Sequence, residues 1–239
     1  MLKKVKKIII NRSVTNAVRF LIDNFIPPII RDNKYFMLPF FKLSYNGGKV
    51  KEYMEFKSKY YSLNNEELEK IYNNYQSIGT ERETDLSNRC IRYIIKNISS
   101  DSKSLLDVAC GRGYFLKCLN NSNLNLHGAD VLDKVELENA KYTKANLENL
   151  PFEDNAFDTV VSSHTLEHII DIRQAVKELK RVAKNQIIIT VPCQRYFYYT
   201  LDLHLHFFQK KEMLINLIQV KNHTIKKIRG DWVYIGYLN

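Results

Sequence analysis

The sequence has no hydrophobic run long enough to cross a membrane, and it contains little cysteine. Its most apolar stretch, residues 20–30, is interrupted by Asp23, Asn24 and the Pro27-Pro28 pair, so we do not expect a spanning helix. Four cysteines among 239 residues, with no Cys-x-x-Cys pair, are too few for a disulfide framework. These absences exclude membrane-spanning and disulfide-stapled proteins, and they indicate reduced thiols in a cytoplasm.

Positive charge is concentrated in the N-terminal part of the chain. Residues 1–100 hold 18 basic and 10 acidic side chains, whereas residues 101–239 hold 18 and 16. Such a distribution favours acidic substrates, phosphates or an anionic membrane surface as partners. The start resembles the charged head of a signal peptide, but its apolar run stops at Asn11 and no cleavage site follows. We therefore expect a cytoplasmic protein whose basic Lys3–Lys7 segment can contact the inner face of a membrane.

From residue 104 onward, short apolar runs alternate with stretches of helical periodicity, which is typical of a parallel sheet with crossover helices. Because the runs show little polar alternation, both faces of the sheet should be buried. The pattern predicts an α/β fold. The expected strands are 104–109, 124–129, 142–145, 157–162, 186–191, 224–228 and 232–237, and the expected helices are 86–98, 171–184 and 210–219.

The first 85 residues have a different pattern and are predicted to form a helical cap on the sheet domain, which spans residues 86–239. Ser13 is suited to cap a helix that ends at Pro27. An aromatic, basic stretch (35–61) and a polar helix (66–75) follow. Within the sheet domain, residues 193–209 form an insertion after the fifth expected strand.

The stretch Leu105–Phe115, LLDVACGRGYF, carries the clearest chemical signal. An apolar strand ends near Asp107, a small-residue turn follows, and a helix begins. Such a turn lets the backbone approach a ligand closely. The next expected strand ends in Gly128-Ala129-Asp130, and an acid at this position suits a bidentate contact with ribose hydroxyls.

Two later motifs follow in order: NLENLPF at residues 146–152 with DNAFDTV at 154–160, and SSHTLEHI at 162–169. Together the four motifs resemble class I S-adenosylmethionine-dependent methyltransferases over residues 105–191. Nicotinamide enzymes usually carry a third glycine where this chain has Leu116. The resemblance implies a Rossmann-like, doubly wound, seven-stranded sheet, mostly parallel with the last strand antiparallel.

The resemblance also implies S-adenosylmethionine as cofactor and assigns residues to it by position. Asp107 would lie near the cofactor amine, Asp130 would hold the ribose, and His164 would border the sulfonium. Ala109 and Asn146 depart from the commoner glycine and aspartate. The implied cofactor-binding residues are Arg82, Asp107, Ala109, Cys110, Gly111, Gly113, Asp130, Val131, Asn146, Leu147, Ser162 and His164.

Histidines provide the candidates for a general base, because their side chain titrates near neutrality. His164 follows the fourth expected strand, and His204 and His206 lie in the insertion, where an acceptor would bind. The string His164–His168 also matches the His-x-x-Glu-His pattern of inverted zinc proteases, with Glu167 as base. No third ligand is evident in the sequence, so we expect no metal site.

The acceptor does not follow from the motifs. The basic N-terminal region resembles that of methyltransferases of bacterial surface-polysaccharide and sugar pathways, which implies O-methylation of a sugar, a sugar nucleotide or a phosphoryl-linked small metabolite. An RNA methyltransferase is the first alternative, although no RNA-binding module is recognisable. A non-catalytic cofactor-binding module is the second. Tyr72 and Tyr75 are further candidates for closing over the site.

Overall fold

A computed structural model describes residues 20–22, 25–45, 48–63, 67, 70, 71, 74, 83–133 and 135–238. The chain divides into two compact units. Unit 1 comprises Met1–Asp85 and Arg195–Leu205, and unit 2 comprises Leu86–Gln194 and His206–Asn239. Most of the insertion predicted at 193–209 therefore belongs to unit 1. The expected Ser13 helix lies outside the described residues except for its last turn, and the expected helix 66–75 is described at only a few positions.

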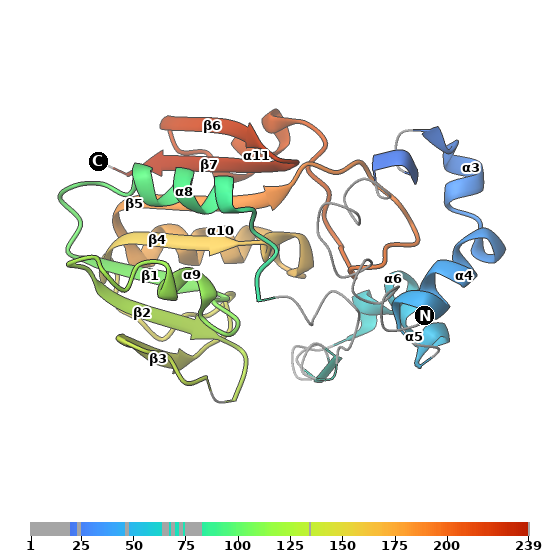
Figure 1. The fold of residues 1–239 in the computed structure, drawn as a ribbon, viewed down its shortest axis with the longest axis horizontal. Helices are drawn as coiled ribbons and strands as arrows, with labels where there is room; N and C mark the ends of the chain where they lie inside the picture. The colour runs from blue at the N-terminus through green and yellow to red at the C-terminus, as the bar shows by residue number, and fades with distance from the viewer. Residues whose placement is uncertain are drawn as a thin grey trace. The chain divides into compact units, whose positions relative to one another are not determined.

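Unit 2 is built on a seven-stranded sheet in the order β3-β2-β1-β4-β5-β7-β6 (Figure 1). Strands β1 to β5 pair in parallel, and β7 runs antiparallel to both β5 and β6. The predicted fold of this unit is confirmed. Its strands are β1 (Ser104–Val108), β2 (Asn125–Asp130), β3 (Ala140–Lys144), β4 (Phe157–Ser163), β5 (Ala183–Pro192), β6 (Asn222–Ile228) and β7 (Asp231–Tyr237).

Helices cover both faces of this sheet. On one face lie α8 (Asn88–Asn97) and α9 (Tyr114–Lys117), and on the other lie α10 (Ile172–Val182) and α11 (Lys211–Ile218) (Figure 1). Successive strand residues alternate between two apolar clusters: Leu106 packs with α10 and α11, and Leu105 packs with α8 and α9. This double burial explains why the strands show little polar alternation.

Side-chain caps and strand pairing set the helix ends. Ser87 accepts a hydrogen bond from the amide of Cys90 at the start of α8, and Asp171 accepts one from Gln174 at the start of α10. The helix predicted over 171–184 ends at Val182, because Ala183 already pairs with Phe157 of β4. The short helix η3 (Leu166–His168) follows β4.

Unit 1 contains α3 (Pro28–Arg31), α4 (Lys34–Ser44), α5 (Val50–Met54), α6 (Phe56–Lys59) and η1 (Tyr60–Ser62). Asn33 caps α4 by accepting hydrogen bonds from the amides of Tyr35 and Phe36. The buried aromatic rings of Tyr45 and Tyr53 stack with centroids 4.3 Å apart. The 195–205 segment completes this unit: Arg31 donates to the carbonyl of Tyr199 (2.9 Å), and Tyr45 Oη donates to that of Leu201 (2.6 Å).

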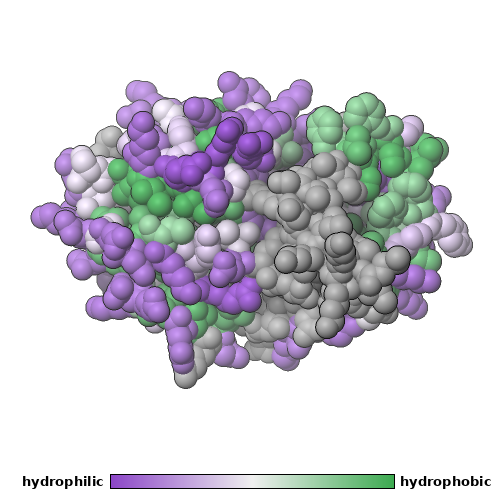
Figure 2. All heavy atoms as spheres, in the orientation of Figure 1, coloured by the Kyte–Doolittle hydropathy of each residue, from purple (hydrophilic) through white to green (hydrophobic). Residues whose placement is uncertain are grey.

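An apolar surface lies over α3 and the residues before it, at the upper right of Figure 2. Phe25 and Ile29 are 72% and 84% exposed there. No helix within the described ranges is long and apolar enough to cross a bilayer.

Candidate cofactor and active site

In the turn after β1, every second residue has a left-handed backbone conformation. The φ angles of Ala109, Gly111 and Gly113 are 59°, 53° and 76°. Alternating left-handed residues orient successive amides toward a common anionic or carbonyl group. Glycine is needed most at Gly113, because a Cβ there would lie 2.1 Å from Cδ2 of Leu137. The turn predicted from the sequence is thus present, with Ala109 carrying the conformational strain that a glycine would avoid.

Asp130, the last residue of β2, closes this turn. Its Oδ2 accepts a hydrogen bond from the amide of Gly111 (2.7 Å), and its Oδ1 accepts one from Leu132 (3.2 Å). Burial raises the pKa of this carboxyl, while amide hydrogen bonds from Gly111, Leu132 and Val131 oppose the shift. The Asp130 carboxylate thus stabilises the turn, and its oxygens keep lone pairs that can accept hydrogen bonds from further donors.

Asp107 is the second buried carboxyl at this end of the sheet. It lies within β1, opposite Gly128 of β2, and only 3% of its surface is exposed. Burial, and to a lesser extent the charge of Asp130, raises the pKa of Asp107 to about 8. A buried acid with this pKa would be stabilised in its ionised form by a cationic ligand group.

Cys110, between these acids, is not a reactive thiol. Burial, followed by the charges of Asp107 and Asp130, raises its pKa, so the sulfur stays protonated. Its amide donates to the carbonyl of Ala129 (3.1 Å), which ties the turn to β2. The contribution of Cys110 is therefore its backbone.

The segment after β3 forms an Asx turn. Asn146 Oδ1 accepts from the amide of Glu148 (2.9 Å), which leaves the Asn146 side-chain amide as a donor, and Leu147 is buried. Two side chains of α10 hold this segment in place, although neither was predicted from the sequence as a site residue. Glu178 accepts from the amide of Leu150 (2.8 Å), and Arg181 donates to the carbonyls of Leu150 and Phe152. The Glu-x-x-Arg spacing in α10 is the sequence feature from which this pair could have been predicted.

The end of β4 places Ser162 beside β1, where it pairs with Val108. The Ser162 hydroxyl is buried and makes no hydrogen bond to any other described residue. Such an orphaned group beside the glycine turn is a further position for a ligand atom.

His164, two residues further on, lies between two buried carboxyl groups. Its φ is 54°, its Nδ1 is 3.5 Å from Oε1 of Glu167, and its Nε2 is 3.6 Å from Oδ1 of Asp231. Burial lowers the pKa of His164, but the nearby carboxylates of Asp231 and Glu167 outweigh this effect and raise the pKa to about 10. His164 is therefore cationic at neutral pH, and this makes it unsuited to act as a general base.

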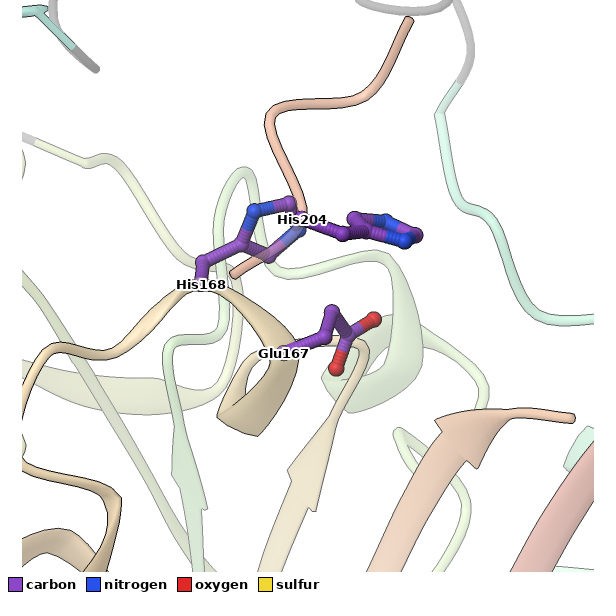
Figure 3. A group of neighbouring side chains, drawn as sticks. All are labelled: Glu167, His168 and His204. Carbon is purple, nitrogen blue, oxygen red and sulfur yellow. The ribbon is translucent and has the colours of Figure 1, made fainter. Parts of the chain in front are cut away.

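The zinc-protease pattern does not take the geometry that it requires. Two histidines four residues apart bind one metal when they share a face of an α-helix. Here the chain turns through left-handed His164, and only Leu166–His168 is helical, as the 3₁₀ turn η3. Figure 3 shows Glu167 and His168 projecting from this turn. His164 is engaged with Glu167 and Asp231 instead.

His206 is the base candidate that unit 2 places beside η3. Its backbone amide donates to the carbonyl of Glu167 (3.0 Å), and its Nε2 lies 2.8 Å from the carbonyl oxygen of Ile169. A carbonyl can only accept, so Nε2 carries the proton and Nδ1 of the neutral ring has a lone pair. His204, also drawn in Figure 3, belongs to unit 1, where its Nε2 is 3.9 Å from Oδ2 of Asp202. Arg82, Tyr72 and Tyr75 lie outside the described residues.

These features fit the expected cofactor. An amide-lined turn, a buried carboxyl in need of a cation, a ribose-type acid and an orphaned hydroxyl lie at the carboxyl ends of β1, β2 and β4. The set matches a ligand that carries an amine and neighbouring hydroxyls.

Comparison with known proteins agrees with this geometry. Residues 106–190 match the family model "Methyltransferase domain". An uncharacterised protein of Methanocaldococcus jannaschii is 30% identical over 141 residues, which are 57% of this chain and 48% of that protein. The ubiquinone/menaquinone biosynthesis C-methyltransferase UbiE of Rickettsia bellii is 32% identical over 108 residues, covering 38% of this chain and 44% of UbiE. The chain thus spans less than half the length of these relatives.

The solved structure of an S-adenosylmethionine-dependent methyltransferase from Thermotoga maritima, a possible histamine N-methyltransferase by its description, resembles this fold. It has a TM-score of 0.51 at 16% identity, and the match covers 62% of this chain and 87% of that one. Unit 2 therefore has the class I S-adenosylmethionine-dependent methyltransferase fold, and the cofactor that this family implies is S-adenosylmethionine.

Proposed function

We propose that this chain transfers a methyl group from S-adenosylmethionine to a small, acidic acceptor. The single observation that carries the proposal is the pair Asp107 and Asp130. These buried acids flank an amide-lined turn, and the raised pKa of Asp107 calls for a cationic ligand group. When bound, the cofactor would supply an electrophilic methyl group on a sulfonium: an aligned acceptor atom would bond to the methyl carbon as the carbon–sulfur bond breaks, with S-adenosylhomocysteine as the leaving group.

Each residue of the site has a proposed part in binding. Asp107 pairs with the amine of the methionine moiety, and Asp130 with Val131 holds the ribose. The backbone of Ala109–Gly113 accommodates the methionine end, and the Ser162 hydroxyl faces it. Asn146 and Leu147 meet the adenine, with the Asn146 amide as the donor. Alignment of this kind accounts for about 7–11 kcal/mol of barrier reduction in well-oriented systems.

We propose that His206 Nδ1 takes the proton from an acceptor hydroxyl. Its Nε2 is held by the Ile169 carbonyl, so the ring is oriented and the lone pair is on the other nitrogen. His164 would not accept this proton, because it is already cationic and lies between the carboxylates of Glu167 and Asp231. Its proposed part is to hold the loop after β4 in position. His204 remains a second candidate from unit 1.

For the acceptor, we retain the proposal of a sugar, a sugar nucleotide or a phosphoryl-linked small metabolite. The basic excess of residues 1–100 supports an acidic molecule. The similarity to UbiE keeps carbon as an alternative acceptor atom. RNA methylation and non-catalytic cofactor binding are the competing proposals.

We also propose that the protein makes peripheral contact with an anionic membrane. The exposed Phe25 and Ile29 of unit 1 favour it, because apolar side chains beside basic sequence suit an interfacial surface. The Lys3–Lys7 segment itself lies outside the described residues. Flotation with phosphatidylglycerol liposomes at low salt tests the proposal, and a protein that stays at the bottom contradicts it.

Calorimetric titration with S-adenosylmethionine and S-adenosylhomocysteine tests the main proposal. We expect binding that Asp130→Asn weakens and that Asp133→Asn, an exposed acid of the same loop, leaves unchanged. Isotope-labelled methyl transfer is then screened with sugar nucleotides, phosphorylated sugars and RNA. A folded protein that binds neither ligand would refute the proposal, and transfer to RNA alone would replace the acceptor class.

A further inference from the structure

Positive charge in unit 2 is concentrated on helix α8 and around the edge strand β6. Residues 86–98 and 220–231 contain these elements and hold seven basic side chains but one acid, the buried Asp231. By comparison, residues 101–194 hold 11 basic and 13 acidic side chains. The seven cations are all exposed: Arg89, Arg92, Lys96, Lys221, Lys226, Lys227 and Arg229.

Two contacts join α8 to β6 and show how they lie. Cys90 Sγ, in the first turn of the helix, is 3.4 Å from the carbonyl oxygen of Ile228, the last residue of the strand. Further along the helix, the centroid of the Tyr93 ring is 5.2 Å from Nζ of Lys226. The helix and the strand are therefore neighbours that run in opposite directions, and both can be followed in Figure 1.

The cations consequently form two neighbouring rows. On α8, Arg89, Arg92 and Lys96 are spaced three and four residues apart, so they share one face of the helix over about 10 Å. On the strand, Lys226 lies beside the middle of that row, and Arg229 follows β6 at the end where α8 begins. We call these five side chains the α8–β6 surface.

Little negative charge compensates this surface. Within the described parts of the chain, none of its five side chains forms an ion pair, and Lys226 contacts the Tyr93 ring instead. Asp231 is buried beside His164, and Asp101 lines a cavity with Asn222 at the far end of α8 and β6. Like charges four residues apart on a helix repel each other, and a bound polyanion would relieve that repulsion.

The chemistry of the surface favours a nucleic acid over a bilayer. No large apolar side chain of α8 or β6 is exposed, so the surface offers nothing to insert into lipid. Arginine presents paired N–H donors to phosphate oxygens, and lysine adds a point charge. Clustered arginine and lysine along a helix, in a chain with a pI of about 9.3, are the electrostatic signature of nucleic-acid binding.

We propose that the α8–β6 surface binds the phosphodiester backbone of a nucleic acid. This inference goes beyond the proposed function, because it names a partner of unit 2 and leaves the proposed methyl acceptor as it stands. Contacts with phosphates carry no sequence information, so binding should be independent of sequence. Binding should also weaken steeply as salt is added, because neutralised phosphates release counterions.

Fluorescence anisotropy of a labelled oligouridine, with the full chain and a series of salt concentrations, tests the surface. We expect the wild type to bind and the double variant Arg92→Gln/Lys226→Gln to bind about tenfold or more weakly. The slope of log affinity against log salt should shrink by about 1.4, because two contacts with a single strand are lost. A wild type that does not bind oligouridine or any other nucleic acid would overturn the proposal.

The matched control is Arg173→Gln/Lys177→Gln, which removes the same two charges from exposed positions of α10, on the other face of the sheet. It should bind oligouridine as the wild type does. Equal losses in the two double variants, or no loss in either, would overturn the proposal. Affinity for S-adenosylhomocysteine, measured in both variants, reports whether unit 2 has kept its fold.

A second measurement needs no variant and therefore does not depend on variant folding. Limited acetylation of the wild type, read by mass spectrometry, should be slowed by oligouridine at Lys96 and Lys226 but not at Lys177. Acetylation of the first two lysines that saturating oligouridine leaves unchanged would contradict the surface.

Further arms identify the source of the phosphodiester backbone. Single-stranded RNA, duplex RNA and single-stranded DNA are compared at one salt concentration, and preferential binding of any of them names the partner. Binding to phosphatidylglycerol vesicles that Arg92→Gln/Lys226→Gln abolishes, without binding to any nucleic acid, would overturn the proposal. Failure of the wild type to bind S-adenosylhomocysteine would refute the proposed function and leave the nucleic-acid result unaffected.

Discussion

The Nε2 atom of His164 lies 3.6 Å from Oδ1 of Asp231, which joins the end of β4 to the first residue of β7. Glu167 approaches the other ring nitrogen, and Cys90 Sγ of α8 is 3.5 Å from Oδ2 of Asp231. A buried cation between two carboxyl groups ties the loop beside the cofactor site to the antiparallel part of the sheet. Breaking it leaves uncompensated charge in the interior.

The stability of the fold should therefore depend on the charge of His164. Its pKa rises from 6.5 to about 10 on folding, so the stabilisation is complete below pH 6.5 and is lost as the pH rises toward 10. We expect the free energy of unfolding to fall over this range, by up to about 1.4 kcal/mol per pH unit. Urea denaturation at a series of pH values measures this slope.

His164→Asn is the matched variant, because asparagine tolerates the left-handed backbone at this position. It should be less stable than the wild type by about 3–5 kcal/mol near neutrality, and the difference should shrink at high pH. Since Asp107 titrates in part of this range, the difference between the two proteins is the diagnostic quantity. A difference that does not change with pH would show that His164 is neutral.

Asp107→Asn should raise the stability of the fold and lower its affinity for the cofactor. Because the pKa of Asp107 is raised from 3.8 to about 8 on folding, its contribution to stability is complete below pH 3.8 and is lost as the pH rises toward 8. Relative to the wild type, the variant should therefore gain stability as the pH rises from about 4 to 8, by up to about 1.4 kcal/mol per pH unit, and the gain should level off above pH 8. Affinity for S-adenosylmethionine should fall by about tenfold or more, since the charge that meets the amine is gone.

Binding of the cofactor to the wild type at pH 7 should also release a proton from Asp107. Titrations in buffers of different ionisation enthalpy measure this release, which Asp107→Asn should abolish. Release that persists in the variant would assign the proton to another group.

Gly111→Ala and Gly113→Ala should differ, although both residues have positive φ. A Cβ at Gly111 meets no atom within 4 Å, so this variant bears only the left-handed strain of about 1–2 kcal/mol. At Gly113 the new Cβ overlaps Leu137, which adds about 1–3 kcal/mol of overpacking. Thermal unfolding should rank Gly113→Ala as the less stable, and Gly113→Ala with Leu137→Ala should recover part of the loss.

His206→Gln should lower turnover by about 10²–10⁴-fold while the affinity for S-adenosylhomocysteine stays near that of the wild type. His223→Gln is the control, since His223 hydrogen-bonds the Val220 carbonyl at the edge of the sheet. Turnover is measured with whichever acceptor the screen identifies. A loss of cofactor affinity in His206→Gln would mark this residue as structural instead.

Local signals in the sequence predicted the sheet and the glycine turn. Asp107, Gly111, Gly113 and Asp130 follow from strand ends and turn chemistry, and the structure places them together. The strands β3, β5 and β6 begin two or three residues earlier than predicted, because pairing with neighbouring strands extends their starts.

Contacts between distant residues were not predictable. Asp231 carries no local signal that it faces His164, and nothing around Arg31 or Tyr45 indicates that they bind the carbonyls of Tyr199 and Leu201. The helix α4 was also missed, because Pro39 lies inside it and suggests a break. Such features depend on tertiary packing, which periodicity does not report.

The division of unit 1 into two stretches of sequence affects the order in which the protein can fold. Residues 1–85 leave the ribosome long before Arg195–Leu205, which supplies Phe197 and the carbonyls that Arg31 and Tyr45 bind. The described helices of unit 1 therefore cannot make these contacts until most of unit 2 has been synthesised. During that interval their aromatic surface is available to chaperones, and a chain interrupted before Leu205 would leave it permanently incomplete.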